Sequence, residues 1–389
     1  MPVIFAVHSP PFVVKSHREM KRFPAPLDLK KVKVLPLARR RSLSAIEDIL
    51  VDPTQPPPAC APEMLEQIRA CAGNVAAARK QDASVILMYG AHLVKNGALR
   101  IVNELVDRGW VTHLATNGAG TIHDWELAFQ GRTEESVREN VATGTFGTWN
   151  ETGRNIHLAL LAGAPHGEGY GQSLGRFIEE DGVTLTEPST LEKELRDVPS
   201  HPLAPARAEL LRAMVSNRLR GGRVNVKHPY KETSILANAF RRGTAMTVHP
   251  GIGYDIITNH PMFRGAVVGR AADIDFRLLG GSIEQLDGGV VLSVGSAIMA
   301  PQVFEKSISC VNNLRLQSGR QIVHDHSIFV VDIQDNGHWD WSKGEPAKDH
   351  PAYYLRFCKS FARMGGRMNY LQCDNVVFLH NLLHALKQA

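Results

Sequence analysis

The strongest constraint on the fold is an alternation of short apolar runs with longer segments of helical spacing. The run at residues 83–89, ASVILMY, is almost continuously apolar and ends at Gly90. A strand of this composition is expected to have both faces covered, as in a parallel sheet. The segments on either side, 61–80 and 93–108, carry apolar residues at helical intervals. This order of strand and helix predicts a mostly parallel sheet covered by helices.

The same alternation continues along the chain. We expect further strands at residues 110–115, 223–226, 245–249, 289–294, 328–333 and 368–371. Further helices are expected at residues 232–242, 265–286, 301–316 and 375–387, and the stretch from about 130 to 222 is expected to be mostly helical. The predicted fold class is α/β, a Rossmann-like, doubly wound, mostly parallel sheet with helices on both faces.

Residues 1–60 differ from the rest of the chain. They contain short apolar runs and basic residues, and they end in a proline-rich stretch at residues 52–58. Proline cannot continue a helix, and it stiffens an extended connection. We therefore predict an N-terminal arm or edge unit over residues 1–60 and an α/β domain over residues 61–389.

Composition narrows the class of protein. Hydrophobic residues make up 43% and charged residues 21% of the chain, as in globular proteins. The net charge is only +5, and the one dense basic run, residues 39–41, lacks interleaved aromatics, so no nucleic-acid partner is expected. No segment approaches about 18 apolar residues, so no membrane partner is expected. The five cysteines are scattered, which favours reduced thiols and a cytoplasmic location: Cys60, Cys71, Cys310, Cys358 and Cys373.

Glycine-rich turns follow three of the expected strands, at residues 116–120, 251–253 and 295–297. Backbone N–H groups at such turns can hold a phosphate, and ligands of doubly wound sheets lie beyond the carboxyl ends of the strands. These turns can also simply reverse the chain, but three of them together favour a nucleotide ligand. His123 and Asp124 follow the first turn and are placed for ligand contact. Helix capping by Asp124 is the alternative.

Histidine is frequent, with 17 residues. His324 and His326 alternate with Asp325, which would place both imidazoles on one side of a strand. With a third ligand they would form a metal site, so a metal-dependent hydrolase is one hypothesis. No HExxH-type motif accompanies them, and hydrogen-bonded or surface histidines without a metal are the expectation.

Lys359 ends an aromatic-rich segment, YYLRFCK, at residues 353–359. A lysine that loses its hydration in such a setting has a lowered pKa and can act as an amine nucleophile. A solvated helix lysine is the alternative.

In their order along the chain, these motifs resemble the deoxyhypusine synthase family. A first block covers residues 85–97 and 111–124 and is similar to the family's nucleotide-binding strand–helix–strand unit. A second block runs from residue 234 to His260 and includes HPGIGYD at residues 249–255. A third consists of residues 290–295, followed at a similar spacing by Pro351 and Lys359. The resemblance covers roughly residues 80–380.

The resemblance implies an NAD-binding, Rossmann-like fold in a homo-oligomer, a dimer or tetramer. It also implies transfer of an aminobutyl group from a polyamine through a lysine imine. By this resemblance Lys359 forms the imine, while Asp255 and His260 bind the substrate, a carboxylate being suited to an ammonium group. The implied NAD-binding residues form a larger set: His92, Asn96, Thr116, Asn117, Gly118, Gly120, His123, Asp124, Gly251, Gly295 and Ser296.

The chain departs from the family at several segments, and one of them bears directly on proton transfer. Residues 299–301 read Met-Ala-Pro where the family has Lys-His-His, whose histidine transfers protons. We therefore expect an NAD-dependent transferase that acts on an amine or polyamine and is not a true deoxyhypusine synthase. The alternative is a non-catalytic or regulatory NAD-binding protein on the same scaffold.

Overall fold

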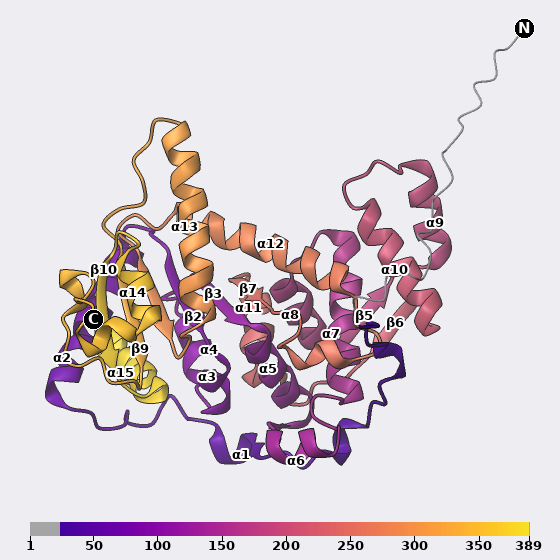
Figure 1. The fold of residues 1–389 in the computed structure, drawn as a ribbon, viewed down its shortest axis with the longest axis horizontal. Coiled ribbons are helices and arrows are strands. Elements are labelled where there is room, and N and C mark those ends of the chain that lie inside the picture. The colour runs from indigo at the N-terminus through magenta and orange to yellow at the C-terminus, as the bar shows by residue number, and fades with distance from the viewer. Residues whose placement is uncertain (1–23, 389) are drawn as a thin grey trace, which may run out of the picture.

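A computed structural model describes residues 24–388, and a six-stranded parallel sheet forms their centre (Figure 1). The chain begins this sheet at β2, adds β3 and β7 on one side, and then adds β8, β9 and β10 on the other. This is the strand order 3-2-1-4-5-6 of Rossmann folds, so the predicted fold class is confirmed. The strands are β2 (Val85–Tyr89), β3 (His113–Asn117), β7 (Ala245–His249), β8 (Val290–Val294), β9 (Ser327–Asp332) and β10 (Arg367–Gln372).

Helices cover both faces of the sheet, which explains the continuous apolar runs. Every residue of β2 and of β8 is buried. In β2, Leu87 belongs to the core with α2, α4 and α15, whereas Met88 belongs to the core with α12 and α13. Successive strand residues therefore point to opposite, equally apolar layers. The helices are α2 (Pro62–Lys80), α4 (Leu99–Asp107), α15 (Asn375–Gln388), α12 (Gly265–Glu284) and α13 (Met299–Gln317).

The helix expected at residues 93–108 is instead two helices, α3 (Ala91–Lys95) and α4. The break lies at Gly97, which has a φ of +82°. A Cβ at Gly97 would lie 1.7 Å from the carbonyl oxygen of Ile49, so the N-terminal arm packs directly against this backbone. Val51 also donates its N–H to the carbonyl of Gly97. The contact that breaks the helix thus comes from a distant segment of the chain.

Gly97→Ala is therefore expected to destabilise the protein more than the same change at Gly109. Both glycines have positive φ, but a Cβ at Gly109 would meet nothing within 4 Å. The left-handed conformation alone costs an L-residue about 1–2 kcal/mol. Urea unfolding should show that cost for Gly109→Ala and a larger one for Gly97→Ala. Equal losses would contradict the close approach of Ile49.

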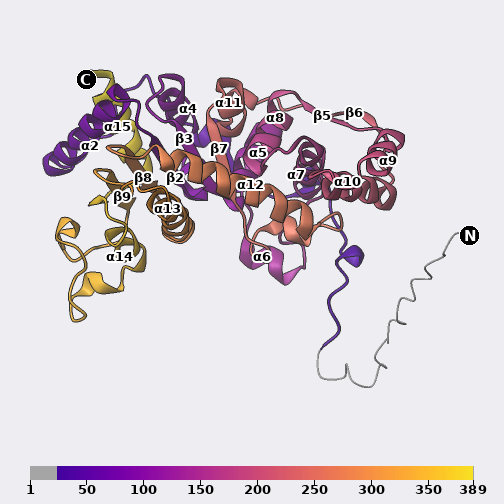
Figure 2. The same cartoon turned by 90° about the horizontal axis from the view of Figure 1, so that it is seen from above.

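The stretch between β3 and β7 is mostly helical, as predicted. It contains α5 (Gly118–Gln130), α6 (Val137–Ala142), α7 (Asn150–Gly163), α8 (Tyr170–Glu179), α9 (Pro188–Asp197), α10 (Ala204–Asn217) and α11 (Ile235–Arg242). The strand expected at 223–226 is present as β6 (Gly222–Asn225), but it pairs antiparallel with β5 (Gly182–Leu185) outside the main sheet. Helices α9 and α10 lie at the end of the molecule opposite to α2 and α15 (Figures 1 and 2).

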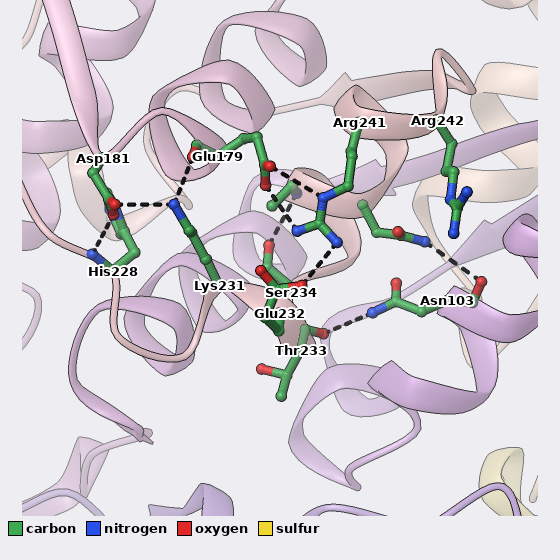
Figure 3. A network of polar contacts seen from close by, with 12 residues as sticks. Asn103, Glu179, Asp181, His228, Lys231, Glu232, Thr233, Ser234, Arg241 and Arg242 are labelled. Carbon is green, nitrogen blue, oxygen red and sulfur yellow. Dashed lines mark hydrogen bonds and ion pairs between the residues drawn. The ribbon is translucent and has the colours of Figure 1, made fainter.

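A polar network ties the end of α8 and the residues that flank β5 and β6 to the loop before α11 and to α11 itself (Figure 3). The Lys231 ammonium donates to the Asp181 carboxylate at 2.9 Å and to the carbonyl of Glu179 at 2.8 Å. Arg241 on α11 pairs with the Glu179 carboxylate at 2.8 Å. The backbone N–H of His228 donates to Asp181, also at 2.8 Å. These contacts hold the loop that leads into α11.

The described part of the N-terminal arm, residues 24–60, packs on the main body. Leu37 and Ile46 belong to the same apolar core as the sheet. The short strand β1 (Ser44–Ala45) pairs antiparallel with β4 (Arg132–Thr133), and α1 (Ile46–Ile49) follows it. The rest of the predicted arm, residues 1–23, lies outside the described residues. None of the helices in residues 24–388 combines the length and the apolar character needed to cross a bilayer.

Candidate functional site

A cleft of about 550 Å³ opens at the carboxyl ends of the strands between β2 and β8. It is lined by Asn117 and by segments that each follow a strand: residues 90–92 with Asn96, 295–299, 331–334 and 373–375. The strand order reverses between β2 and β8, and ligands of doubly wound sheets bind at such a switch point. The volume also lies in the usual range of small-molecule sites, about 300–1,000 Å³.

Two glycines let the strand ends approach each other in this cleft. A Cβ at Gly90 would lie 2.3 Å from the carbonyl oxygen of Gly295. Gly295 has a φ of +58°, a conformation that glycine adopts without cost. Backbone therefore forms the floor of the cleft, and no side chain separates β2 from β8 at this point.

Two long helices begin at the cleft. Residues 297–299 lead into α13, and residues 373–375 lead into α15. The Ser296 hydroxyl accepts from the N–H of Ala300 at 3.3 Å, and the Asn96 amide donates to Asn375 at 3.0 Å. Helix N-termini favour anionic groups, because their backbone N–H groups and the helix dipole point at the ligand. At α15 the Asp374 carboxylate, which also lines the cleft, already accepts from the N–H groups of Val376 and Val377, so the start of α13 is the end left open to an anion. The apolar walls of the cleft include Val331 and Ile333.

The predicted cofactor residues divide between this cleft and other places. Those that line it are His92, Asn96, Asn117, Gly295 and Ser296. The turn at 116–120 mainly starts α5. The Asn117 side chain accepts from the N–H of Gly120 at 2.8 Å, and the Thr116 hydroxyl donates to the carbonyl of Tyr89 at 2.9 Å. A Cβ at Gly120 would lie 2.3 Å from that hydroxyl oxygen, which explains the glycine.

Asp124 is buried inside α5 and connects it to α11. Its carboxylate accepts from the N–H of Leu236 at 2.9 Å, at the start of α11. Burial raises the pKa of Asp124 to about 7. Asp124 thus caps a neighbouring helix and does not line the cleft.

A second cavity, of about 250 Å³, lies on the other side of α3 and the start of α5. Asp255 is one of its walls. A Cβ at Gly118 would lie 2.0 Å from an Asp255 carboxylate oxygen, so the glycine at the start of α5 makes room for this side chain. The N–H of Gly251 donates to the same carboxylate at 2.8 Å. Burial raises the pKa of Asp255 to about 6. Gly118 and Gly251 therefore position Asp255.

The second cavity is rich in charged side chains that the sequence did not single out. Lys95 and Glu134 pair at 2.6 Å, and the arm contributes Arg40, which is buried against Glu126. The basic run at residues 39–41 was visible in the sequence, but nothing in it distinguished Arg40 from its neighbours. The lining residues are Arg40, Lys95, Ala119, Ile122, His123, Glu126, Glu134, Glu135, Val137, Phe146, Tyr254, Asp255 and Ile256.

His260 and Lys359 are not among the residues that line either cavity. The His260 ring packs on Gly153, its Nδ1 accepts from the N–H of Met262 at 3.1 Å, and burial lowers its pKa to about 4. Lys359 lies on α14 (Arg356–Ala362), with its Nζ 3.7 Å from the centre of the Tyr353 ring.

His324 and His326 precede β9 and do not share a strand face. The strand begins at Ser327, and Asp325 between the histidines has a φ of 55°. His324 pairs with Asp287 at 3.1 Å, whereas His326 packs against Phe304. Among residues 24–388, no group of three or more His, Cys, Asp or Glu side chains is arranged to hold a metal ion.

Comparison with known proteins finds distant likenesses of fold. No protein-family model matches the sequence, and no curated protein matches it. The ternary complex of AgrE with ornithine and NAD⁺ has a TM-score of 0.42 at 12% identity, covering 85% of this chain and 34% of AgrE. This chain therefore spans about a third of the length of AgrE.

Two further solved structures are of more similar length. A conserved candidate LOR/SDH protein from Methanococcus maripaludis S2 has a TM-score of 0.42 at 11% identity, covering 92% of this chain and 76% of its own. A candidate deoxyhypusine synthase from Entamoeba histolytica has a TM-score of 0.32 at 11% identity, covering 79% of this chain and 76% of its own.

Proposed function

We propose that the chain binds NAD in the switch-point cleft and acts on a small amine held in the second cavity. The observation that carries the proposal is the position of the cleft, where the strand order reverses and two long helices begin. The N-terminus of α13 would hold the pyrophosphate. Val331 and Ile333 offer apolar surface to a ring, and Asn96 and Ser296 offer hydrogen bonds to ribose.

The start of α5 borders both cavities. Asn117 lines the cleft, and Ala119 lines the second cavity. Bound NAD would supply a hydride acceptor. The Asp255 carboxylate would hold the ammonium group of the amine by a charge-assisted hydrogen bond, and the carbon next to the nitrogen would donate the hydride.

Transfer of an aminobutyl group through a lysine imine is the finer form of this proposal. Because α14 does not border either cavity of a single chain, we propose that Lys359 reaches the amine from a neighbouring subunit of a homo-oligomer. Borohydride reduction of the chain incubated with NAD and amine would trap the adduct on Lys359. An adduct that persists in Lys359→Met would exclude this lysine.

A second candidate is a non-catalytic NAD-binding protein, and the position of Lys359 outside both cavities favours it. Both candidates require NAD binding, but they differ in turnover. The discriminating experiment incubates the chain with NAD and small amines, including spermidine and 1,4-diaminobutane, and follows NADH by its absorbance. Amine-dependent NADH that is lost in Asp255→Asn supports the enzyme. Saturable NAD binding without any NADH supports the second candidate.

The affinity of the chain for an amine is expected to depend on the charge of Asp255. Its pKa of about 6 means that the carboxylate is ionised at pH 7 and becomes protonated as the pH falls below 6. Amine affinity should then fall by about tenfold per pH unit below 6, because the protonated acid has no charge to offer the ammonium. Calorimetric titrations from pH 7.5 to 5 would measure this. Asp255→Asn should bind weakly, without that pH dependence.

A further inference from the structure

Glu126 is a fully paired carboxylate buried beside the second cavity. The Arg40 guanidinium donates to both of its oxygens, at 2.7 and 2.8 Å. The hydroxyls of Thr152 and Thr133 donate one bond each, at 2.8 and 2.6 Å. Burial acts to raise the pKa of Glu126, but Arg40 outweighs it, and the pKa is lowered. The Glu126 side chain is therefore ionised and can only accept hydrogen bonds.

This arrangement fixes the proton on His123. The only hydrogen of the Thr133 hydroxyl is directed to Glu126, and the Thr133 oxygen lies 2.7 Å from His123 Nδ1. The oxygen can then only accept, so Nδ1 must carry the proton and donate it. Burial lowers the pKa of His123 to about 4, so the ring is neutral near pH 7. The second ring nitrogen, Nε2, is left as a lone-pair acceptor.

Two of the groups that the second cavity offers a ligand are acceptors, and the Tyr254 hydroxyl, which can donate or accept, also lines it. His123 lines the cavity, and within residues 24–388 nothing donates to its Nε2. Asp255 also lines it, and its Oδ1 is buried without a hydrogen-bond partner among those residues. Lys95 is already paired with Glu134. At about 250 Å³ the cavity has room for roughly eight water molecules, and so for a ligand of few heavy atoms.

We propose that His123 Nε2 is the acceptor that selects the ligand of this cavity, and that the chain Arg40–Glu126–Thr133 holds His123 in the required tautomer. A primary ammonium group donates in several directions and can satisfy both Nε2 and Asp255. A ligand without N–H groups leaves Asp255 Oδ1 buried and unpaired and offers Nε2 no donor. This inference rests on the proposed function in taking a small amine as the ligand. It makes Arg40, and so the N-terminal arm, a positioning element of the site.

Two threonine variants separate this role from simple stability. Thr133→Val and Thr152→Val each remove one hydroxyl from Glu126, but only Thr133 also contacts His123. Nitrogen NMR of ¹⁵N-histidine-labelled protein should show His123 protonated at Nδ1 in the wild type and in Thr152→Val. In Thr133→Val it should show protonation at Nε2. Calorimetric affinity for 1,4-diaminobutane should fall about tenfold or more in Thr133→Val and stay within about twofold in Thr152→Val.

Three results would overturn the inference: Nε2 protonated in the wild type, equal loss of affinity in the two threonine variants, or a wild type that does not bind 1,4-diaminobutane. His123→Phe provides a second variant, which keeps a ring but has no acceptor, and it should lose affinity as Thr133→Val does. NAD titration of the same proteins distinguishes failure of the proposed NAD binding from failure of the proposed role of His123. A wild type that fails to bind NAD overturns the proposed function, while the tautomer and the amine affinity still decide the role of His123.

Discussion

Arg40→Met is expected to lower the free energy of unfolding by about 3–5 kcal/mol, the usual cost of leaving one member of a buried ion pair alone. The side chains of Arg40 and Glu126 are each only 1% exposed. Removing the guanidinium leaves a buried carboxylate with two hydroxyl donors but no cation. Urea unfolding of the wild type and the variant measures the difference.

The neighbouring arginines are matched controls. Arg39 and Arg41 are exposed, so Arg39→Met and Arg41→Met should each change the free energy of unfolding by less than about 0.5 kcal/mol. The double variant Arg40→Met with Glu126→Leu should recover most of the loss, because no unpaired charge remains buried. A loss for Arg40→Met no larger than that of its neighbours would mean that the arm does not pair with Glu126.

Acidification from pH 7 to pH 5 is expected to destabilise the chain strongly. Burial lowers the pKa of a set of histidines below the ordinary value near 6.5, whereas in the unfolded chain each regains that value. The unfolded state therefore binds more protons than the folded state as the pH falls below 6.5. The free energy of unfolding that is present above pH 6.5 is lost as the pH falls toward 4. At pH 5 the loss is about 2 kcal/mol for each histidine. The set comprises His113, with a pKa of about 3, and His123, His157, His228, His249, His260 and His326, each with a pKa of about 4.

Three buried carboxyl groups act in the opposite sense but are fewer. Burial raises the pKa of Asp124 and of Asp275 to about 7 and that of Asp255 to about 6, so their contribution to stability is lost as the pH rises from about 4 to 7. Urea midpoints measured from pH 7.5 to 5 should still fall, and unchanged midpoints would contradict the account. His326→Leu should reduce the pH dependence of the free energy of unfolding by the equivalent of about one bound proton.

The sheet was predictable because its signal is local. A strand such as β2, which is buried at every position, needs a run of apolar residues. That run can be recognised in the sequence without knowledge of the strands beside it in the sheet. The break at Gly97 was not predictable, because it depends on the approach of Ile49 from the arm. The helical spacing on both sides of Gly97 continues as if the break were absent.

Part of the cleft could be predicted from the sequence because ligands bind beyond the carboxyl ends of strands. The glycines at 90 and 295 follow two strands that the sequence marks clearly. The same rule, applied to the strands at 328–333 and 368–371, would have added residues 331–334 and 373–375. The use of the turn at 116–120 was not predictable, because tertiary packing decides whether its amides meet a ligand or a side chain such as Asn117.

The cleft at the switch point is the central claim, and one titration tests it directly. Ala297 lines the cleft, so Ala297→Trp would fill it, whereas Ala142 is exposed at the end of α6 and gives a matched control. Calorimetric titration with NAD should show saturable binding to the wild type and to Ala142→Trp, and at least about tenfold weaker binding to Ala297→Trp. A wild type that does not bind NAD, or equal affinity in Ala297→Trp, would contradict the account.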